Sequence, residues 1–237
     1  RLFMPPLLIF LDMPMEKDAL HLIRKSEKCA CAGDFDYLCR ENACGRIVMD
    51  IREIIDRIYR MPESSAVRLA ACMSSLSRPR GYCVLEAGRV EPNLFFIGRG
   101  IARACISADG KKVTFWIGAE GSALVSLKSY VDDEPGYETV ELMEDSLLYV
   151  LKRSDLERFL AEDIHIANWA RRFAESEFLR TEQKLIPMLF LPAARRYETL
   201  LRERPELLRR VPLETLASYL GITPVSLSRI RARMKSK

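Results

Sequence analysis

The stretch from residue 212 to residue 230 constrains the fold of this chain most, because it reads as two short helices joined by a tight turn. Apolar residues recur there at the i, i+3, i+4 and i+7 spacing of a one-sided helix, at Leu213, Leu216, Ala217 and Leu220. Pro212 suits the first turn, where a missing N–H costs nothing. Gly221 follows the last apolar residue and can take the left-handed conformation that ends a helix.

A second helix is predicted to begin at Thr223, a favourable N-cap residue, with Pro224 in its first position. Its inward residues are Leu227, Ile230 and Met234. Its opposite face carries Val225, Arg229, Ala232 and Arg233, flanked by Ser226 and Ser228. Two such helices form a helix-turn-helix, whose second helix can enter the major groove of DNA. The alternative is an ordinary helical hairpin at the end of a domain.

The predicted DNA-binding residues lie on this second helix and at its ends: Thr223, Val225, Ser226, Ser228, Arg229, Arg233 and Lys235. Arg229 is long enough to donate hydrogen bonds to a base edge, and its small neighbours allow close approach. Thr223, Ser226, Arg233 and Lys235 are expected to contact phosphates, which set register and not sequence.

Charge is distributed unevenly along the chain. Residues 191–237 contain eleven Lys and Arg residues against four Glu, whereas the remainder contains 26 basic and 29 acidic residues. A basic C-terminal module on a slightly acidic body is typical of nucleic-acid binding, although arginines can also simply solvate a surface.

The segment ASYLGITPVSLSRIR resembles the C-terminal helix-turn-helix of the Crp/Fnr family of bacterial transcription regulators, in its short Bacteroidetes-type form. The resemblance implies that Arg229 is the arginine that reads the groove. The family's other two usual base readers, an Arg and a Glu, fall on Pro224 and Val225. We therefore expect an operator that differs from the usual family sequence.

Over residues 80–152 the sequence pattern changes to that of short strands separated by frequent turns. This pattern predicts a β-roll or jelly roll. Asp109-Gly110 lies between two apolar runs and predicts a hairpin. The segment LFFIGRGIARACISADGKKVTFWI resembles the cyclic-nucleotide-binding-type double-stranded β-helix of the same family. Helices are predicted over 51–58 and 65–76 as the entry to this domain, which is expected to span 49–153.

The resemblance implies an effector pocket within residues 115–140, with candidate lining residues Trp116, Ser122, Lys128, Tyr137 and Thr139. A buried phosphate needs an arginine or a ring of backbone N–H groups. No arginine lies between Arg103 and Arg153, and Asp132 and Glu138 would repel a phosphate. The effector is therefore expected not to be cAMP, and its identity stays open. The alternative is an empty roll that serves as a scaffold.

Residues 154–190 are predicted to form one long helix, capped by Ser154 with Glu157 and ended or kinked by Pro187 near Ile186. A heptad-like stripe follows it at Ile166, Trp169, Phe173 and Leu179. The family resemblance implies that this helix pairs with its twin in a homodimer. The alternative is that the stripe packs against its own roll, and the two arrangements can hold at different ends of the helix.

The predicted helix-turn-helix domain spans 191–237. Pro192 is expected to open its first helix, with Tyr197, Leu200 and Leu201 facing inward and Arg204-Pro205 interrupting it before Leu207-Leu208. Residues 1–48 show no sustained period and are interpreted as a non-domain extension, either untranslated, with Met49 as initiator, or without fixed structure. Its cysteines Cys29, Cys31, Cys39 and Cys44 match no usual metal-ligand spacing, and the alternative is an iron–sulfur redox sensor.

The odd total of seven cysteines, with no evident secretory signal, favours a reducing cytoplasm. The apolar run at residues 2–11 is too short to span a bilayer. An enzyme is not expected, because His21 and His165 are the only histidines and no catalytic motif accompanies them. No cofactor and no metal are predicted.

Together these features predict an α+β chain: a jelly-roll sensor domain, a long dimerisation helix and a helix-turn-helix. Its expected partners are double-stranded DNA, a second copy, RNA polymerase and an unknown small effector, with no membrane. The alternative is a cyclic-nucleotide-binding-like interaction module without a specific DNA target.

Overall fold

The structure is a computed structural model that describes residues 48–108 and 110–235. Two helices come first, α2 (Ile51–Ile58) and α3 (Glu63–Ala71). Asp50 caps α2 by accepting a hydrogen bond from the Arg52 amide. The helix predicted over 65–76 was placed too far along the chain, because strand β1 already begins at Ser74. Pairing of Ser74 with Val150 on β8 overrides the local helical pattern.

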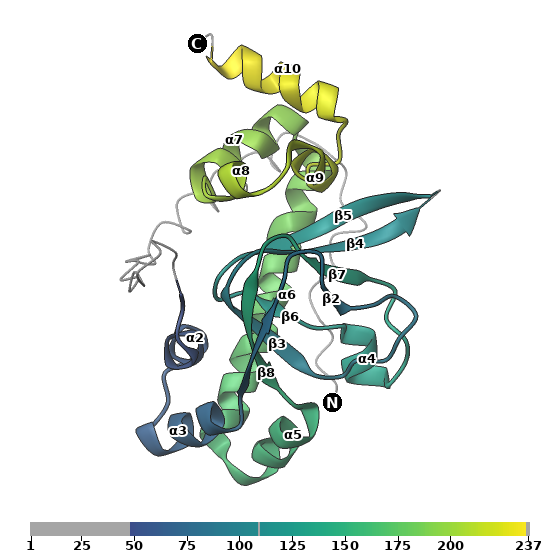
Figure 1. Cartoon of the computed structure of the whole chain (residues 1–237). Helices are drawn as coiled ribbons and strands as arrows, with labels where there is room; N and C mark the ends of the chain where they lie inside the picture. The colour runs from purple at the N-terminus through teal and green to yellow at the C-terminus, as the bar shows by residue number, and fades with distance from the viewer. Residues whose placement is uncertain (1–47, 109, 236–237) are drawn as a thin grey trace, which may run out of the picture. The chain divides into compact units, whose positions relative to one another are not determined.

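In the part of the chain that the structure describes, eight strands form two four-stranded sheets, as predicted for a jelly roll (Figure 1). The order is β1-β8-β3-β6 in one sheet and β2-β7-β4-β5 in the other. Their bounds are β1 (Ser74–Arg78), β2 (Cys83–Leu85), β3 (Leu94–Arg99), β4 (Ala102–Ala108), β5 (Lys111–Gly118), β6 (Ala123–Leu124), β7 (Thr139–Leu142) and β8 (Ser146–Leu151). The short helix α4 (Leu127–Asp132) lies between β6 and β7.

The predicted hairpin is confirmed, because β4 and β5 pair up to Ala108 with Lys111, while Asp109 lies outside the described residues. Gly110 has a φ of 72°, which an L side chain rarely adopts, so glycine suits the turn. The first four residues of strand β3 are all apolar because both faces of the strand are buried. Phe95 and Ile97 point into the roll, while Leu94 and Phe96 point to helices on the other side of the sheet.

The single helix predicted over 154–190 is wrong, because the chain breaks at Asp163 into α5 (Arg153–Glu162) and α6 (Ile164–Phe190). The Asp163 carboxylate accepts hydrogen bonds from the amides of His165, at 3.0 Å, and Ile166, at 3.3 Å. These bonds start a new helix. Ser154 therefore lies inside α5, whose N-cap is Lys152. Pro187 does not end α6, which continues to Phe190.

The first half of α6 packs on its own roll, as the alternative predicts, so Ile166 and Trp169 are wrong as dimer contacts. Ile166 and Trp169 have no exposed surface. The Trp169 indole Nε1–H donates to the carbonyl of Ile55 at 3.1 Å, and its ring stacks on Phe173 with centroids 5.9 Å apart. Ile166 and Trp169 are therefore unavailable to a partner, since they join α2, α3 and β3 in one core.

Four helices end the described chain: α7 (Ala193–Glu203), α8 (Leu207–Arg210), α9 (Leu213–Tyr219) and α10 (Pro224–Lys235). Tyr197 and Leu200 are buried as predicted, but Leu201 is exposed. Their core continues into the roll through Ile101 and Ile117. Within the described residues, no helix combines the length and apolarity needed to cross a membrane.

Candidate nucleic-acid interface

The turn between α9 and α10 has the geometry that the sequence predicts. The Ile222 amide donates to the Ala217 carbonyl at 3.0 Å, and the Gly221 amide donates to the Ser218 carbonyl at 2.9 Å. This pair of bonds is a Schellman motif, which requires a left-handed residue, and Gly221 has a φ of 67°. The Thr223 side chain then caps α10 by accepting from the Ser226 amide at 3.2 Å.

The two faces of α10 are oriented as expected. Leu227 is fully buried, and Ile230 and Met234 are half-buried against the same core. Val225, Ser228, Arg229 and Arg233 are exposed. Ser226 is half-buried, and the Thr223 hydroxyl donates to its Oγ at 3.0 Å. The side chain of Lys235, the last of the predicted DNA-binding residues, lies outside the described part of the chain.

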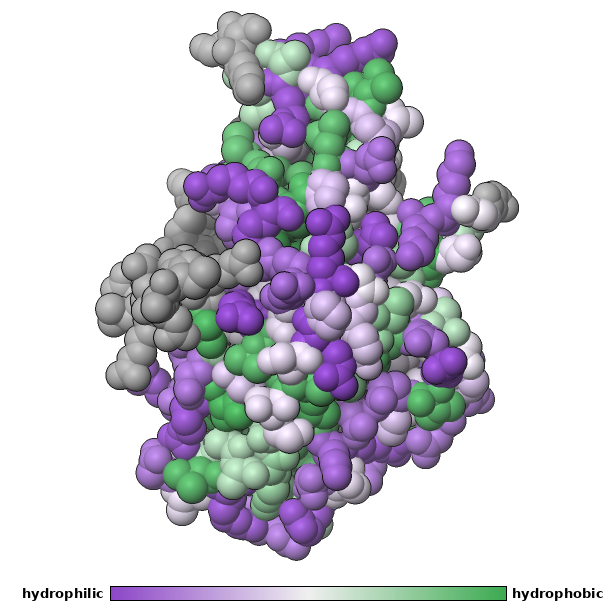
Figure 2. All heavy atoms as spheres, in the orientation of Figure 1, coloured by the Kyte–Doolittle hydropathy of each residue, from purple (hydrophilic) through white to green (hydrophobic). Residues whose placement is uncertain are grey.

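The arginines of α10 differ from those of the preceding helices in their partners. On α7 and just after it, Arg195, Arg202 and Arg204 each pair with a glutamate. Within the part of the chain that the structure describes, Arg229, Arg231 and Arg233 form no ion pair. Figure 2 shows hydrophilic side chains at the end of the molecule that α10 forms. This end therefore carries positive charge that the described residues leave uncompensated.

The roll holds the helix-turn-helix through polar bonds as well as the shared core. Arg210 on α8 donates to both carboxylate oxygens of Glu120, at 2.9 and 2.7 Å, and also pairs with Glu144. The Thr114 amide on β5 donates to Ser218 Oγ at 2.8 Å. Figure 1 shows α10 beyond α9, on the side away from the β4–β5 hairpin. The contacts thus fix α9 while α10 presents its outer face.

The ion pair at Arg210 shifts the pKa values of its members. Burial alone would raise the pKa of Glu120, but bonds from Arg210 and from the Gly100 amide outweigh it and hold that pKa below its ordinary value. Burial alone would lower the pKa of Arg210, but its bonds to Glu120 and Glu144 raise it. Charged Glu120 therefore stabilises the contact between the roll and α8.

We expect Glu120→Gln to reduce the free energy of unfolding by about 1.5–3 kcal/mol, the usual worth of a hydrogen bond to a charged group. Because the pKa of Glu120 is depressed, its contribution is complete above the ordinary value of 4.5 and is lost as the pH falls through the depressed pKa. Urea unfolding, measured from neutral pH down through the depressed pKa, should show the free energies of unfolding of the wild type and Glu120→Gln becoming equal in acid. Glu203→Gln, at an exposed pair with Arg202, is the matched control and should change stability by less than about 0.5 kcal/mol.

A second set of contacts ties α6 to the helix-turn-helix. Lys184 Nζ donates to the Tyr219 carbonyl at 2.9 Å and lies 3.2 Å from the centre of its ring. Arg196 donates to the carbonyls of Leu191 and Leu220, both at 2.6 Å. Burial and, to a smaller degree, the charge of Arg196 lower the pKa of Lys184 to about 8. Two cations thus satisfy the C-terminal carbonyls of α9 and join it to α6 and α7.

That the five candidate effector residues line a pocket stays a prediction, and the structure shows the local contacts of these side chains. Trp116 is half-buried and packs over Gly118. Ser122 Oγ accepts from the Ala119 amide, and Thr139 Oγ1 accepts from the Ala87 amide. Lys128 pairs with Glu134 at the surface, and Tyr137 is 65% exposed. Each side chain thus has a local role or faces solvent, while apolar side chains fill the interior of the roll.

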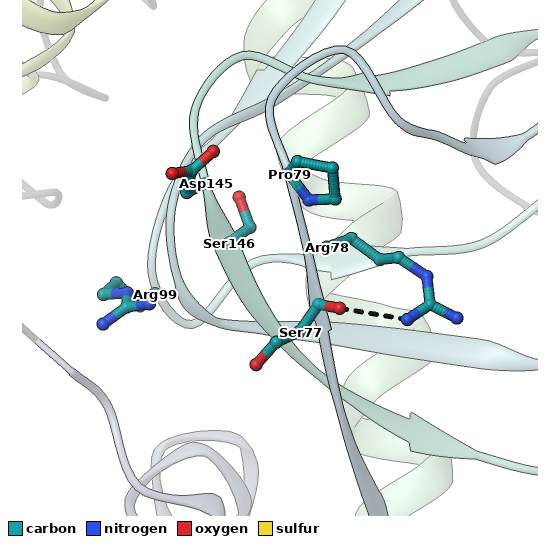
Figure 3. A pocket seen from close by; sticks show the side chains of 6 residues that line it. All are labelled: Ser77, Arg78, Pro79, Arg99, Asp145 and Ser146. Atoms are coloured by element: carbon teal, nitrogen blue, oxygen red, sulfur yellow. Dashed lines mark hydrogen bonds between the residues drawn. The ribbon is translucent and has the colours of Figure 1, made fainter.

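A cavity of about 260 Å³ lies elsewhere, at the edge of the first sheet. Its lining residues, none of which was predicted, are Ser77, Arg78, Pro79, Arg99, Asp145 and Ser146 (Figure 3). Arg78 donates to the Ser77 carbonyl, and Asp145 accepts from the Arg80 amide. The sequence offers no signal for this hollow, because its residues come from three strands and from two separate connections.

The second half of α6 exposes a row of large apolar side chains. The row runs along the helix at Phe178, Leu179, Leu185, Ile186, Leu189 and Phe190. Phe178, Leu185 and Leu189 follow one another at i, i+7 and i+11, which keeps them on one face. Their exposed fractions are 48%, 48% and 66%. Several exposed large apolar side chains on one stretch of a helix are typical of an interaction site. Of the predicted dimer stripe, Leu179 belongs to this row and is 53% exposed.

The cysteines and possible metal ligands give no site in the described residues. Cys72, Cys83 and Cys105 are free thiols, and no cluster of three or more His, Cys, Asp or Glu there could hold a metal ion. Cys29, Cys31, Cys39 and Cys44 lie outside residues 48–108 and 110–235. The iron–sulfur alternative therefore concerns a part of the chain that the structure does not describe.

Comparison with known proteins supports the fold. Residues 76–163 match the family model of the cyclic nucleotide-binding domain. No curated protein sequence matches the chain. Similar solved structures include the c-di-GMP responsive global regulator CLP of Xanthomonas campestris, at 15% identity and a TM-score of 0.58, covering 73% of this chain and 91% of that one.

Two more structures show the same arrangement. A CooA mutant of Carboxydothermus hydrogenoformans is 16% identical with a TM-score of 0.57, over 81% of this chain and 86% of that one. A regulator from Eubacterium rectale, proposed to belong to the Crp/Fnr family, is 14% identical with a TM-score of 0.56, over 74% and 84%. CLP and the Eubacterium rectale protein are both described as regulators. Residues 76–163 therefore form a cyclic nucleotide-binding-type domain, within a chain that has the fold of Crp/Fnr transcriptional regulators.

Proposed function

We propose that this chain is a dimeric, sequence-specific, DNA-binding transcription regulator. The observation that carries the proposal is the outer face of α10, where Arg229 and Arg233 are exposed and, among the described residues, form no ion pair. A capped helix with small polar residues and free guanidinium groups fits the major groove. Arg229 donates to a guanine, while Thr223, Ser226, Arg233 and Lys235 position the helix on phosphates.

Dimerisation uses the apolar row on the second half of α6 and not the buried Ile166 and Trp169. Pairing two copies about a twofold axis places two α10 helices about 34 Å apart, one turn of DNA, on an inverted repeat. The contacts of Lys184 and Arg196 with the end of α9 support this arrangement. They transmit the position of α6 to the helix-turn-helix.

The effector of this regulator is a ligand other than cAMP. The interior of the roll is filled by apolar side chains, including Phe95, Ile97 and Leu148. The residues between Arg103 and Arg153 supply no arginine for a phosphate, and the carboxylate of Glu138 is buried there. Isothermal titration of the full chain with cAMP should therefore give no saturable heat. Tight, saturable binding would contradict this expectation.

Selection on random duplex DNA tests the function as a whole. The full chain should enrich an inverted repeat with a guanine in each half-site, and the enriched sequence should compete far better than its scrambled version. Enrichment of no sequence would instead favour an interaction module without a DNA target. As a regulator it acts in the cytoplasm and works with RNA polymerase. Transcription from a template that carries the enriched repeat, with and without the protein, would show the effect on RNA polymerase.

A further inference from the structure

Val225 is an exception to the packing of the C-terminal helices. Among the large apolar side chains of α7 to α10 that the structure describes, only Leu201 and Val225 are exposed, and Val225 is exposed by 60%. The other apolar residues of α10 face the core shared with α9. An isolated apolar side chain in the middle of a basic, polar helix face contributes favourable free energy only when a partner covers it and removes it from water.

The surroundings of Val225 define what would cover it. Val225 and Arg229 are four residues apart, so they lie on one face of α10, about 6 Å apart along its axis. The hydroxyls of Thr223 and Ser226 bond to each other at 3.0 Å, and Ser228, three residues further on, is exposed. The first turn of α10 contains no acidic residue that could accept from a cytosine amino group.

From this placement we propose that Val225 determines specificity by contacting the 5-methyl group of a thymine. The inference rests on the proposed DNA-binding function and adds a specific base to it. Among the base edges of the major groove, only thymine presents a methyl group, and apolar side chains are its usual readers. A spacing of about 6 Å corresponds to about two base-pair steps of 3.4 Å. The thymine therefore lies within two base pairs of the guanine that Arg229 reads.

Replacing thymine by uracil removes only the methyl group and gives a direct test. The probe is the duplex selected by the full chain, with deoxyuridine in place of that thymine in both half-sites. Burial of one methyl is worth about 0.8 kcal/mol, which converts to about fourfold per half-site and about sixteenfold for the dimer. We expect this loss for the wild-type protein by fluorescence anisotropy. Val225→Ala should bind the thymine and uracil duplexes equally.

Two controls keep the outcomes separate. Deoxyuridine at a thymine outside the half-sites should leave the affinity unchanged. Val225→Ala replaces an exposed side chain, so its melting temperature should match that of the wild type. Specific binding that depends on Arg229 but tolerates uracil would overturn the role of Val225 and leave the proposed function standing. Discrimination between the bases that persists in Val225→Ala would do the same. Absence of any sequence preference would overturn both.

Discussion

Replacing Arg229 by alanine should abolish sequence-specific DNA binding while leaving non-specific binding nearly unchanged. Arg229 is exposed on α10 and forms no ion pair with another described residue, so its removal leaves the fold intact. A bidentate contact between an arginine and a guanine is worth about 1–3 kcal/mol of discrimination. A symmetric dimer makes this contact twice, so we expect specific affinity to fall by about 30-fold to 20,000-fold.

The measurement is competition between the selected duplex and a scrambled duplex at fixed salt, because phosphate contacts make every affinity salt-dependent. Arg229→Lys keeps the charge but loses the planar fork, and should lose most of the same specificity. Arg209→Ala removes an exposed arginine from α8 and should keep the ratio of specific to non-specific affinity. An unchanged footprint of Arg229→Ala on the selected duplex would refute the role of Arg229.

The second large effect is expected from a charge placed in the apolar row of α6. Leu185 lies in the middle of this row and is 48% exposed in the single chain. In a twofold interface Leu185→Glu introduces two buried carboxylates, one from each copy. Each such substitution in an interface costs about 2 kcal/mol or more of binding free energy, so the dissociation constant of the dimer should rise about 1,000-fold.

Sedimentation equilibrium should show the Leu185→Glu protein as a monomer at concentrations where the wild type is a dimer. Specific DNA binding should fall with it, because one helix-turn-helix holds only one half-site. The matched control is Leu201→Glu on α7, where a leucine of similar exposure, 43%, lies outside the row. A Leu185→Glu protein that remains dimeric would place the interface elsewhere.

The helix-turn-helix could be predicted from the sequence because its signals are local. Thr223 caps the helix that it begins, and Gly221 has the positive φ that its turn requires. The inward spacing of Leu227, Ile230 and Met234 follows from the helical period alone. The hairpin at Gly110 is equally local, because only neighbouring residues determine its turn.

The break at Asp163 was missed because part of its cause lies far away in the sequence. The Asp163 carboxylate also accepts a hydrogen bond from Ser65 and pairs with Arg68, both on α3, almost a hundred residues earlier. The residues next to Asp163 in the sequence account only for its hydrogen bonds to the amides of His165 and Ile166. From those residues alone, a helix that continues through Asp163 is equally compatible with the sequence. The same limit explains the misplaced helix over 65–76, since the partner of β1 is β8.

The dimer stripe illustrates a different limit. The spacing of Ile166, Trp169 and Phe173 shows that one face of the helix is apolar, but a face turned to its own roll and a face turned to a twin have the same period. The structure separates the two, because Trp169 bonds to Ile55 and stacks on Phe173 whereas Phe178 and Leu185 have large exposed fractions. The effector residues stay a prediction, since the resemblance located a region of the roll but not the side chains that would line a pocket there.

The sequence by itself determined the class of fold, the order of roll, long helix and helix-turn-helix, and the face of α10 that carries arginines. These properties depend on period, capping and turn residues, which act over a few positions along the chain. Only the tertiary structure decided where α6 begins, which half of it lies open, and how Arg210 and Lys184 hold the helix-turn-helix against the roll and α6. Such contacts join residues far apart in the chain, and their free energy exists only once the whole core has formed.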